Sequence, residues 1–250
     1  LLKPVTLDLF KFLGNDWSAY EDIYGPKTDL SEAQKKHIVD TAKWLTDAVE
    51  SESYGDFDQY FDVENLARFF AGQVLLSNFD GILFNGQNFL MTLAPESNLI
   101  GFSPWDLDHS WGEFPLTGIL KQRTHASIHK PWIGENFFVE KLFELSAFKE
   151  PYLQEIKNQL DNHFLPEKLS ADIDHLAGII RPYVQKEPAP RPAKFEIAVN
   201  SEFVPQRDSG NPMDPNRPSH QIKRFISERR ESVLAQLAGT EEGVIITFEQ

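Results

Sequence analysis

Apolar positions recur at helical spacing in two segments of the amino-terminal half of the chain. Residues 31–50 have one apolar face, and Ser31 with Gln34 three positions later forms a capping box at the start of that segment. Asp62 precedes a second segment, residues 63–76, whose apolar face is broad enough for a buried position. The pattern predicts two helices, the second of them in the core.

A pattern typical of strands follows these helices. Residues 88–93 and 99–103 are short apolar runs, and residues 94–98 between them are turn-forming. Two strands joined by so short a connection pair in antiparallel fashion. These residues therefore predict a β-hairpin.

The carboxyl-terminal half has mainly helical patterns. Helices are predicted from apolar spacing, from Pro151 in a first turn and from serine caps at Ser170 and Ser219, over residues 137–145, 151–164, 170–183 and 219–238. Eight of the sixteen prolines lie between Pro182 and Pro218, which predicts an extended loop over residues 183–218. Residues 244–248 suit one last strand. We expect one α+β, mainly helical domain that spans residues 1–250.

The composition fits a folded protein with an acidic surface. The chain has 250 residues, with 24 Lys and Arg against 38 Asp and Glu, and its net charge is −14 with His neutral. This charge argues against nucleic acid or an anionic membrane as the main partner, because both favour a basic surface. Hydrophobic residues make up 41% of the chain, with 20 Phe, and supply a sizeable core.

Two absences narrow the chemistry further. The chain has no cysteine, which excludes a disulfide framework, a thiolate zinc site and a cysteine nucleophile. No run approaches the roughly 20 apolar residues of a membrane-spanning helix, so we expect no membrane insertion.

Four polar side chains flank the predicted hairpin. Asp80 and Asn85 precede its first strand, and Asp106 and Asp108 follow its second. Because an antiparallel hairpin returns the chain to where it started, these groups are expected to meet at one end of it. Carboxylate and carboxamide oxygens of this kind suit Mg²⁺ or Mn²⁺. The sequence therefore predicts a divalent-metal site at that end.

The order of these features resembles the catalytic lobe of a protein kinase. In that lobe a buried helix is followed by a loop bearing Asp and, five residues later, Asn, and then by a hairpin and a metal-binding Asp. The first Asp orients and deprotonates the acceptor hydroxyl, while the Asn and the last Asp hold the metal against the triphosphate. Phosphoryl transfer depends on such positioning and charge neutralisation. We expect a protein-kinase-like carboxyl-terminal lobe with a hairpin at its catalytic site.

Two motifs narrow this resemblance to one family. An N-x-D-x-x-x-x-N loop stands here as Asn78, Asp80 and Asn85, and a Pro-Trp-Asp-x-Asp segment occupies residues 104–108. Together they resemble the CotH (spore-coat protein H) kinase family, atypical secreted or spore-associated kinases with a remote protein-kinase-like fold. The resemblance covers residues 1–112 and 219–238.

The resemblance implies roles for six residues. Asp80 would be the catalytic residue, Asn85, Asp106 and Asp108 the ligands of Mg²⁺ or Mn²⁺, and Trp105 and Lys3 the nucleotide-binding residues. ATP would be the co-substrate, and a Ser or Thr hydroxyl of a protein would accept its γ-phosphate. The implied location is extracellular, at the cell surface or in the spore coat.

The family's amino-terminal lobe, which carries the Lys that contacts ATP, has no counterpart ahead of Leu1. We therefore expect this chain to be the carboxyl-terminal lobe and hinge, with the other lobe upstream in the parent protein.

Two other classes of function fit the same residues. A non-catalytic structural, cell-surface or spore-coat module would use the acidic cleft to bind a metal or nothing. A secreted carbohydrate-associated module would use tryptophans as sugar platforms, namely Trp17, Trp111 and Trp132.

Single residues have alternatives as well. Asp80 and Asn85 also suit a local turn in which their side chains bond nearby backbone. Asp108 also suits a cap for the next segment, or a partner for His109 or Arg123. The histidines of this region are predicted to be solvated or locally bonded, namely His109, His125 and His129. The small basic cluster of Lys121, Arg123 and Lys130 also suits contact with phosphate or an acidic acceptor, and it is predicted to lie in a solvated loop.

Overall fold

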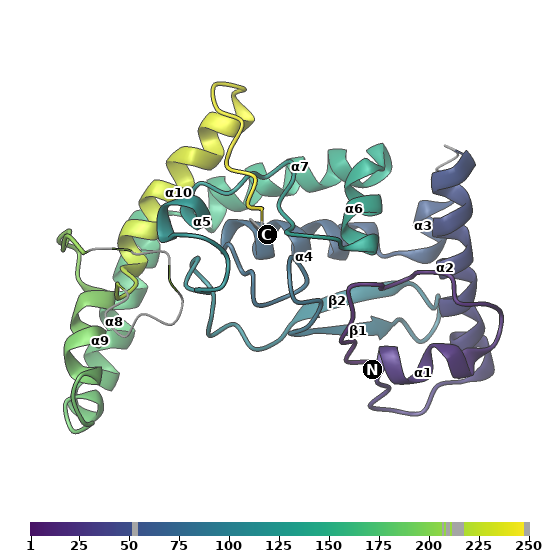
Figure 1. Cartoon of the computed structure of the whole chain (residues 1–250), viewed down its shortest axis with the longest axis horizontal. Coiled ribbons are helices and arrows are strands. Elements are labelled where there is room, and N and C mark those ends of the chain that lie inside the picture. Colours follow the sequence, from purple (N-terminus) through teal and green to yellow (C-terminus); the bar gives the residue numbers. More distant parts are fainter. Residues whose placement is uncertain (52–54, 207, 209–210, 212–217, 248–250) are drawn as a thin grey trace.

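The computed structural model describes residues 1–51, 55–206, 208, 211 and 218–247. The fold is α+β, with about half of the chain in helices and a small antiparallel sheet of two strands (Figure 1). In chain order the elements are η1 (Trp17–Ala19), α1 (Glu21–Tyr24), α2 (Glu32–Ser51), α3 (Phe57–Tyr60), α4 (Val63–Leu75), β1 (Phe89–Leu93), β2 (Ile100–Pro104), α5 (Leu120–Thr124), α6 (Phe137–Glu144), α7 (Ser146–Asn162), α8 (Pro166–Val184), α9 (Arg191–Val199) and α10 (Ile222–Leu237). Within the described ranges, no helix has both the length and the apolar composition that crossing a bilayer requires.

The two predicted amino-terminal helices are confirmed, together with their caps. The Gln34 backbone N–H donates to the Ser31 hydroxyl at 3.2 Å, and the Ser31 N–H donates to the Gln34 amide oxygen at 3.0 Å, which is the capping box of α2. The Asp62 carboxylate accepts the Asn65 N–H at 3.0 Å and caps α4. Helix α4 packs against α7 and β2, so it lies in the core as predicted.

The predicted hairpin is also confirmed. Strands β1 and β2 pair antiparallel with Phe89 opposite Pro104 and Leu93 opposite Ile100. The sequence pattern did not predict that Leu2 pairs with Met91 on the other edge of β1, with N–H···O distances of 2.9 and 3.0 Å. The amino-terminal segment therefore lies along the hairpin that carries the predicted site.

Three predicted helix starts in the carboxyl-terminal half are wrong. Helix α7 begins at Ser146, with Pro151 inside it, and α8 begins at Pro166 rather than behind a cap at Ser170. A proline inside a helix removes only its own N–H donor and strains one turn, and the buried apolar face of α7 outweighs that loss. The cap of α10 is Gln221, not Ser219.

The prediction of an extended loop over residues 183–218 is wrong for residues 183–184, which end α8, and for residues 191–199, which form α9. Pro190 and Pro192 stand at the start of this helix, where the first N–H groups have no intrahelical acceptor, so proline costs little there. The side chain of Arg181 donates to Glu196 at 2.9 Å and ties α8 to α9. Residues 207, 209–210 and 212–217 lie outside the described residues.

The predicted strand at residues 244–248 is reduced to a single bridge. Val244 pairs with Ala126, and residue 248 lies outside the described residues. A lone bridge is enough to hold the carboxyl-terminal segment beside the chain that precedes residue 127.

Phenylalanine rings from separate elements meet in one core. Phe70 of α4 lies edge-on to Phe148 of α7, with ring centroids 5.6 Å apart, and Phe102 of β2 stacks on Phe138 of α6 at 5.8 Å. All four side chains are buried. Aromatic pairs of this geometry add to the stabilisation from area burial, so hairpin and helices share one hydrophobic core.

A buried arginine joins α10 to this core. The Arg229 guanidinium donates to the backbone oxygens of Val74 at 2.8 Å, Ala126 at 2.5 Å and Thr124 at 3.2 Å. Arg229 is 1% exposed, and burial lowers its pKa to about 10. The side chain therefore remains charged at neutral pH, and carbonyl dipoles compensate it.

Replacing Arg229 with Met is expected to lower the free energy of unfolding by about 1–3 kcal/mol, because the buried Thr124 oxygen loses its donor, while the Val74 and Ala126 oxygens each keep one other donor. Urea unfolding monitored by circular dichroism measures this change. Arg224→Met, in the same helix, is the matched control. Arg224 is partly exposed and pairs with Glu228, so its replacement is expected to cost under about 1 kcal/mol. Equal losses in the two variants would show that the buried contacts of Arg229 contribute nothing special.

Candidate functional site

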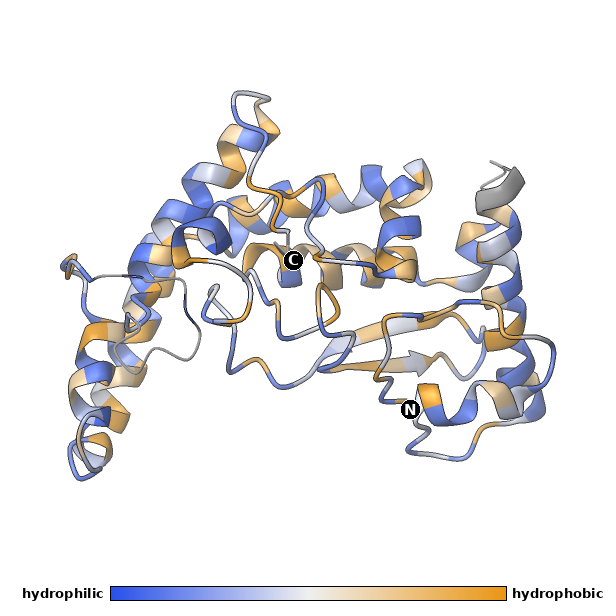
Figure 2. Ribbon diagram, in the orientation of Figure 1, coloured by the Kyte–Doolittle hydropathy of each residue, from blue (hydrophilic) through white to orange (hydrophobic). Residues whose placement is uncertain are grey.

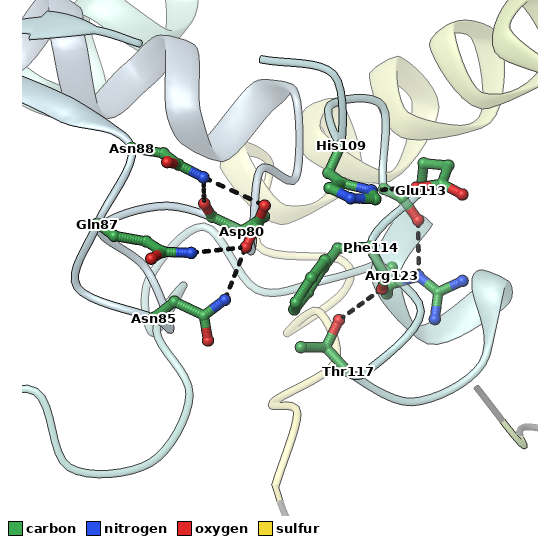
Figure 3. Close-up of polar contacts among 10 residues, drawn as sticks. Asp80, Asn85, Gln87, Asn88, His109, Glu113, Phe114, Thr117 and Arg123 are labelled. Atoms are coloured by element: carbon green, nitrogen blue, oxygen red, sulfur yellow. Dashed lines mark hydrogen bonds and ion pairs between the residues drawn. The ribbon is translucent and has the colours of Figure 1, made fainter. Parts of the chain in front are cut away.

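The predicted site forms where the hairpin opens. One segment, residues 77–88, joins α4 to β1, and a second, residues 105–114, follows β2. The Trp105 N–H donates to the Asn88 oxygen at 3.2 Å, and the Gly112 N–H donates to the Leu76 oxygen at 3.0 Å. These backbone bonds hold the two segments side by side, as the antiparallel pairing predicts (Figure 3).

Three carboxamides orient Asp80 in this site. Asn85 donates to Oδ1 of Asp80 at 2.7 Å, Gln87 donates to the same oxygen at 3.2 Å, and Asn88 donates to Oδ2 at 3.1 Å. Asn88 also donates to the Asp80 backbone oxygen at 2.6 Å. Figure 3 shows the three amides converging on Asp80, while the amide oxygen of Asn85 points away from it. The carboxylate is thus held in one orientation, and the amide oxygen of Asn85 is available as a ligand.

Asp80, Asp108 and His109 together could hold a metal ion. One ligand atom from each lies within 4.8 Å of the others. Asp80 and His109 are partly buried and Asp108 is exposed, so a cation here would be reached from solvent. Two carboxylates and an imidazole suit Mn²⁺, and the carboxylates suit Mg²⁺. The residues present therefore fit a divalent cation.

Glu113 orients His109. Nδ1 of His109 contacts a carboxylate oxygen of Glu113. Burial lowers the pKa of His109, but the hydrogen bond to Glu113 and the negative charges of Glu113, Asp108 and Asp80 outweigh burial, so the pKa is raised. A carboxylate bonded to one ring nitrogen is the arrangement that fixes the ring of a metal-binding histidine.

The structure brings together some of the predicted ligands and leaves one out. Asn85 contacts Asp80, and Asp108 joins Asp80 and His109. Asp106 is exposed and does not join that group; its backbone has φ of 55°, a left-handed conformation that Asp tolerates better than most residues. The metal roles of Asn85, Asp106 and Asp108 stay predictions.

The two residues predicted to bind nucleotide lie together. Nζ of Lys3 is 5.0 Å from the ring centroid of Trp105, whose side chain is 48% exposed. The pairing of Leu2 with β1 places Lys3 there, next to the start of the segment that carries Asp106 and Asp108. The ammonium group lies over an exposed ring, and the role of both residues toward a nucleotide stays a prediction.

Four residues of the site were not predicted from the sequence as functional, namely Gln87, Asn88, His109 and Glu113. The density of amides at residues 85–88 is a local signal for the first two. His109 was predicted to be solvated or locally bonded, and the local bond to Glu113 is present. Its closeness to Asp80 depends on the tertiary fold.

Other predicted roles change with packing. Trp17, Trp111 and Trp132 are partly buried and pack against the core, so their rings contribute to packing, and a role as sugar platforms stays a prediction. Arg123 was predicted to lie in a solvated loop and is buried instead. Its guanidinium donates to the Gly112 oxygen at 2.6 Å and to the Gly118 oxygen, so it braces the segment that follows Asp108.

Gly86 joins the Asp80 loop to the amino-terminal segment. Its φ is +63°, and a Cβ atom there would lie 2.1 Å from the Thr6 backbone oxygen. The Thr6 N–H donates to the Gly86 oxygen at 2.8 Å. Only glycine permits both the left-handed conformation and this close approach.

Gly86→Ala is expected to lower the free energy of unfolding by about 2–5 kcal/mol, because left-handed strain costs about 1–2 kcal/mol and overpacking about 1–3 kcal/mol. Gly134→Ala is the matched control, since Gly134 has φ of +70° and open space where its Cβ would lie. The Gly134→Ala variant is expected to lose only the about 1–2 kcal/mol that left-handed strain costs. Chemical denaturation of both variants measures the difference in unfolding free energy. Losses of equal size would show that the close approach of Gly86 to Thr6 does not contribute to the cost.

Two comparisons with known proteins show which family the chain is similar to. A family model described as CotH kinase protein matches residues 10–233. The chain is similar to inner spore coat protein H of Bacillus subtilis (strain 168), with 27% identity over 130 residues that make up 52% of this chain and 34% of that protein. The matched part of this chain thus spans about a third of the length of that curated relative.

Proposed function

Because the chain belongs to the CotH kinase family, we propose that it is the carboxyl-terminal, kinase-like lobe of an ATP-dependent protein kinase. The observation that carries this proposal is the meeting of Asp80 with Asp108 at the open end of the hairpin. The order of a buried helix, an Asp loop, a hairpin and a second Asp is the order that phosphoryl transfer uses in protein kinases.

In this proposal Asp80 acts on the phosphate acceptor. A Ser or Thr hydroxyl oxygen forms a bond to the γ-phosphorus of ATP, the bond from that phosphorus to the β–γ bridging oxygen breaks, and ADP leaves. Asp80 accepts the hydroxyl proton. The amides of Asn85, Gln87 and Asn88 hold the carboxylate in place for that transfer.

The same proposal assigns the phosphate end of ATP to the acidic side chains. Asp108 and His109, whose ligand atoms lie close to Asp80, would hold Mg²⁺ or Mn²⁺. Asn85 bonds Asp80 through its amide nitrogen and Asp106 is close by in sequence, so their part as ligands rests on the family resemblance. The bound ion would neutralise charge on the phosphates. Trp105 and Lys3 would contact the nucleotide, the ring by stacking and the ammonium by its charge.

The protein substrate and location are inferred from the relative. The name of inner spore coat protein H places that protein in the spore coat. We propose that this chain also acts in the spore coat, outside the cytoplasm, on a coat or surface protein. The matched segment covers 34% of that relative, so the proposal concerns this domain and does not carry over the function of the whole relative.

A non-catalytic module is the second candidate. The observation in its favour is that three side-chain amides already occupy the Asp80 carboxylate, as they would in a static structural loop. Such a module would retain the acidic group and bind a cation without transferring phosphate.

Metal binding is the first test of the site. Asp108→Asn is expected to weaken Mn²⁺ binding at least about tenfold. Loss of a residue that only supports a metal ligand already weakens metal binding about 10–100-fold, and loss of a ligand itself is expected to weaken it at least as much. Isothermal titration calorimetry measures this affinity. Asp161→Asn, an exposed carboxylate on α7, is the control and is expected to leave it unchanged. Unchanged binding in Asp108→Asn would remove that residue from the metal site.

Phosphate transfer separates the two candidate functions. With labelled ATP, Mn²⁺ and a generic protein acceptor, the parent protein, which we expect to carry both lobes, is expected to incorporate label, and Asp80→Asn to reduce the rate at least about a hundredfold because it removes the proton acceptor. Asp161→Asn again serves as control. Mn²⁺ binding that depends on Asp108, without any transfer by the parent protein, would favour the non-catalytic module.

A further inference from the structure

Helix α8 stands at the edge of the molecule with its apolar residues only partly covered. Figure 1 shows α8 and α9 side by side in an arm that extends away from the hairpin and the N-terminus. Ala177 is buried, and Ile173 and Leu169 pack against the core, so one face of α8 meets the body of the protein. The apolar residues of α8 continue beyond that face.

Four apolar residues form an exposed stripe on α8. Leu176, Ile179, Ile180 and Tyr183 are 59%, 54%, 45% and 69% exposed. Their spacing of i, i+3, i+4 and i+7 places them on one side of the helix along two turns. Figure 2 shows the alternation of apolar and polar residues along this arm. A contiguous apolar stripe of this kind on a folded protein marks an interaction surface.

The stripe is self-complementary about its own centre. In an antiparallel pair of α8 helices related by a two-fold axis between Ile179 and Ile180, each Leu176 meets the Tyr183 of the other copy and each Ile179 meets an Ile180. Every apolar side chain of the stripe then has an apolar partner. An isologous contact of this form is the commonest arrangement in homodimers.

Charge at the two ends of the stripe selects the antiparallel arrangement. Asp172 lies one turn before Leu176 and Lys186 lies just after Tyr183, and both are exposed. An antiparallel copy places Asp172 of one chain near Lys186 of the other, whereas a parallel copy would place like charges together. The other charged residues near the stripe already pair within the chain: Asp174 with Lys223, Arg181 with Glu196, and Glu187, which faces Asp172 across the axis, with Arg191.

We propose that the α8 stripe is the contact between two copies of this chain, which pair antiparallel through Leu176, Ile179, Ile180 and Tyr183. This inference is independent of the proposed kinase activity. One helix face buries less than the roughly 800 Å² per partner of a standard interface, so we expect a weak dimer with Kd in the micromolar range.

Sedimentation velocity of the 250-residue chain tests the stripe. From about 1 µM to about 500 µM the wild-type mass is expected to shift from monomer toward dimer. Ile180→Glu is expected to weaken dimerisation at least tenfold, because it places a charge at the apolar centre of the contact. Leu234→Glu on α10 is the matched control, since Leu234 is an exposed leucine outside the stripe. A chain that stays monomeric throughout, or a dimer that survives Ile180→Glu, overturns the proposal.

Charge reversal tests the direction of the pairing. Asp172→Lys and Lys186→Asp are each expected to weaken the dimer severalfold, and the double variant to restore wild-type affinity. Failure of the double variant to recover affinity overturns the antiparallel arrangement. Circular dichroism of each variant confirms that the helices are retained.

Discussion

The structure depends on one buried cation that carries no carboxylate partner. Arg229 of α10 donates to the oxygen of Val74, at the end of α4, and to the oxygens of Thr124 and Ala126, at the end of α5. The site segments lie in the chain between these two ends. Both terminal nitrogens of the guanidinium donate to these oxygens, while Nε is buried without a hydrogen-bond partner. Because a buried charge needs such acceptors, α4, α5 and α10 must keep their relative positions for the terminal nitrogens to remain bonded.

Within that frame the hairpin decides which side chains meet. Its antiparallel register returns the chain from Leu93 to Ile100 and brings the residues after β2 back to the residues before β1. The amides of Asn85 and Asn88 then orient Asp80, and Asp108 arrives from the other segment. Two carboxylates at this distance repel each other, which favours amide donors and a cation beside them. The chemistry of the site therefore follows from strand register and charge.

Local signals predicted much of this fold, and long-range contacts account for what they missed. The cap at Asp62 and the hairpin were predictable because residues a few positions apart form them. The pairing of Leu2 with β1 and the helix at residues 191–199 were missed, since the first joins distant segments and the second begins in a run of prolines that usually indicates a loop. The meeting of acidic segments was predicted, but not that His109 rather than Asp106 joins it, because side-chain direction after β2 is set by the tertiary fold.

The α8 arm and the site are linked through α10. Lys223, near the start of α10, donates to Asp174 of α8 at 2.6 Å and is 7% exposed, and Arg229 lies farther along the same helix. Lys223 and Arg229 are buried, Asp174 is exposed, and the described residues show one arrangement of this link. Coupling between distant sites needs an element with two arrangements. Pairing through the arm would therefore present two copies of the site in a fixed geometry, and it would leave the chemistry within each copy unchanged.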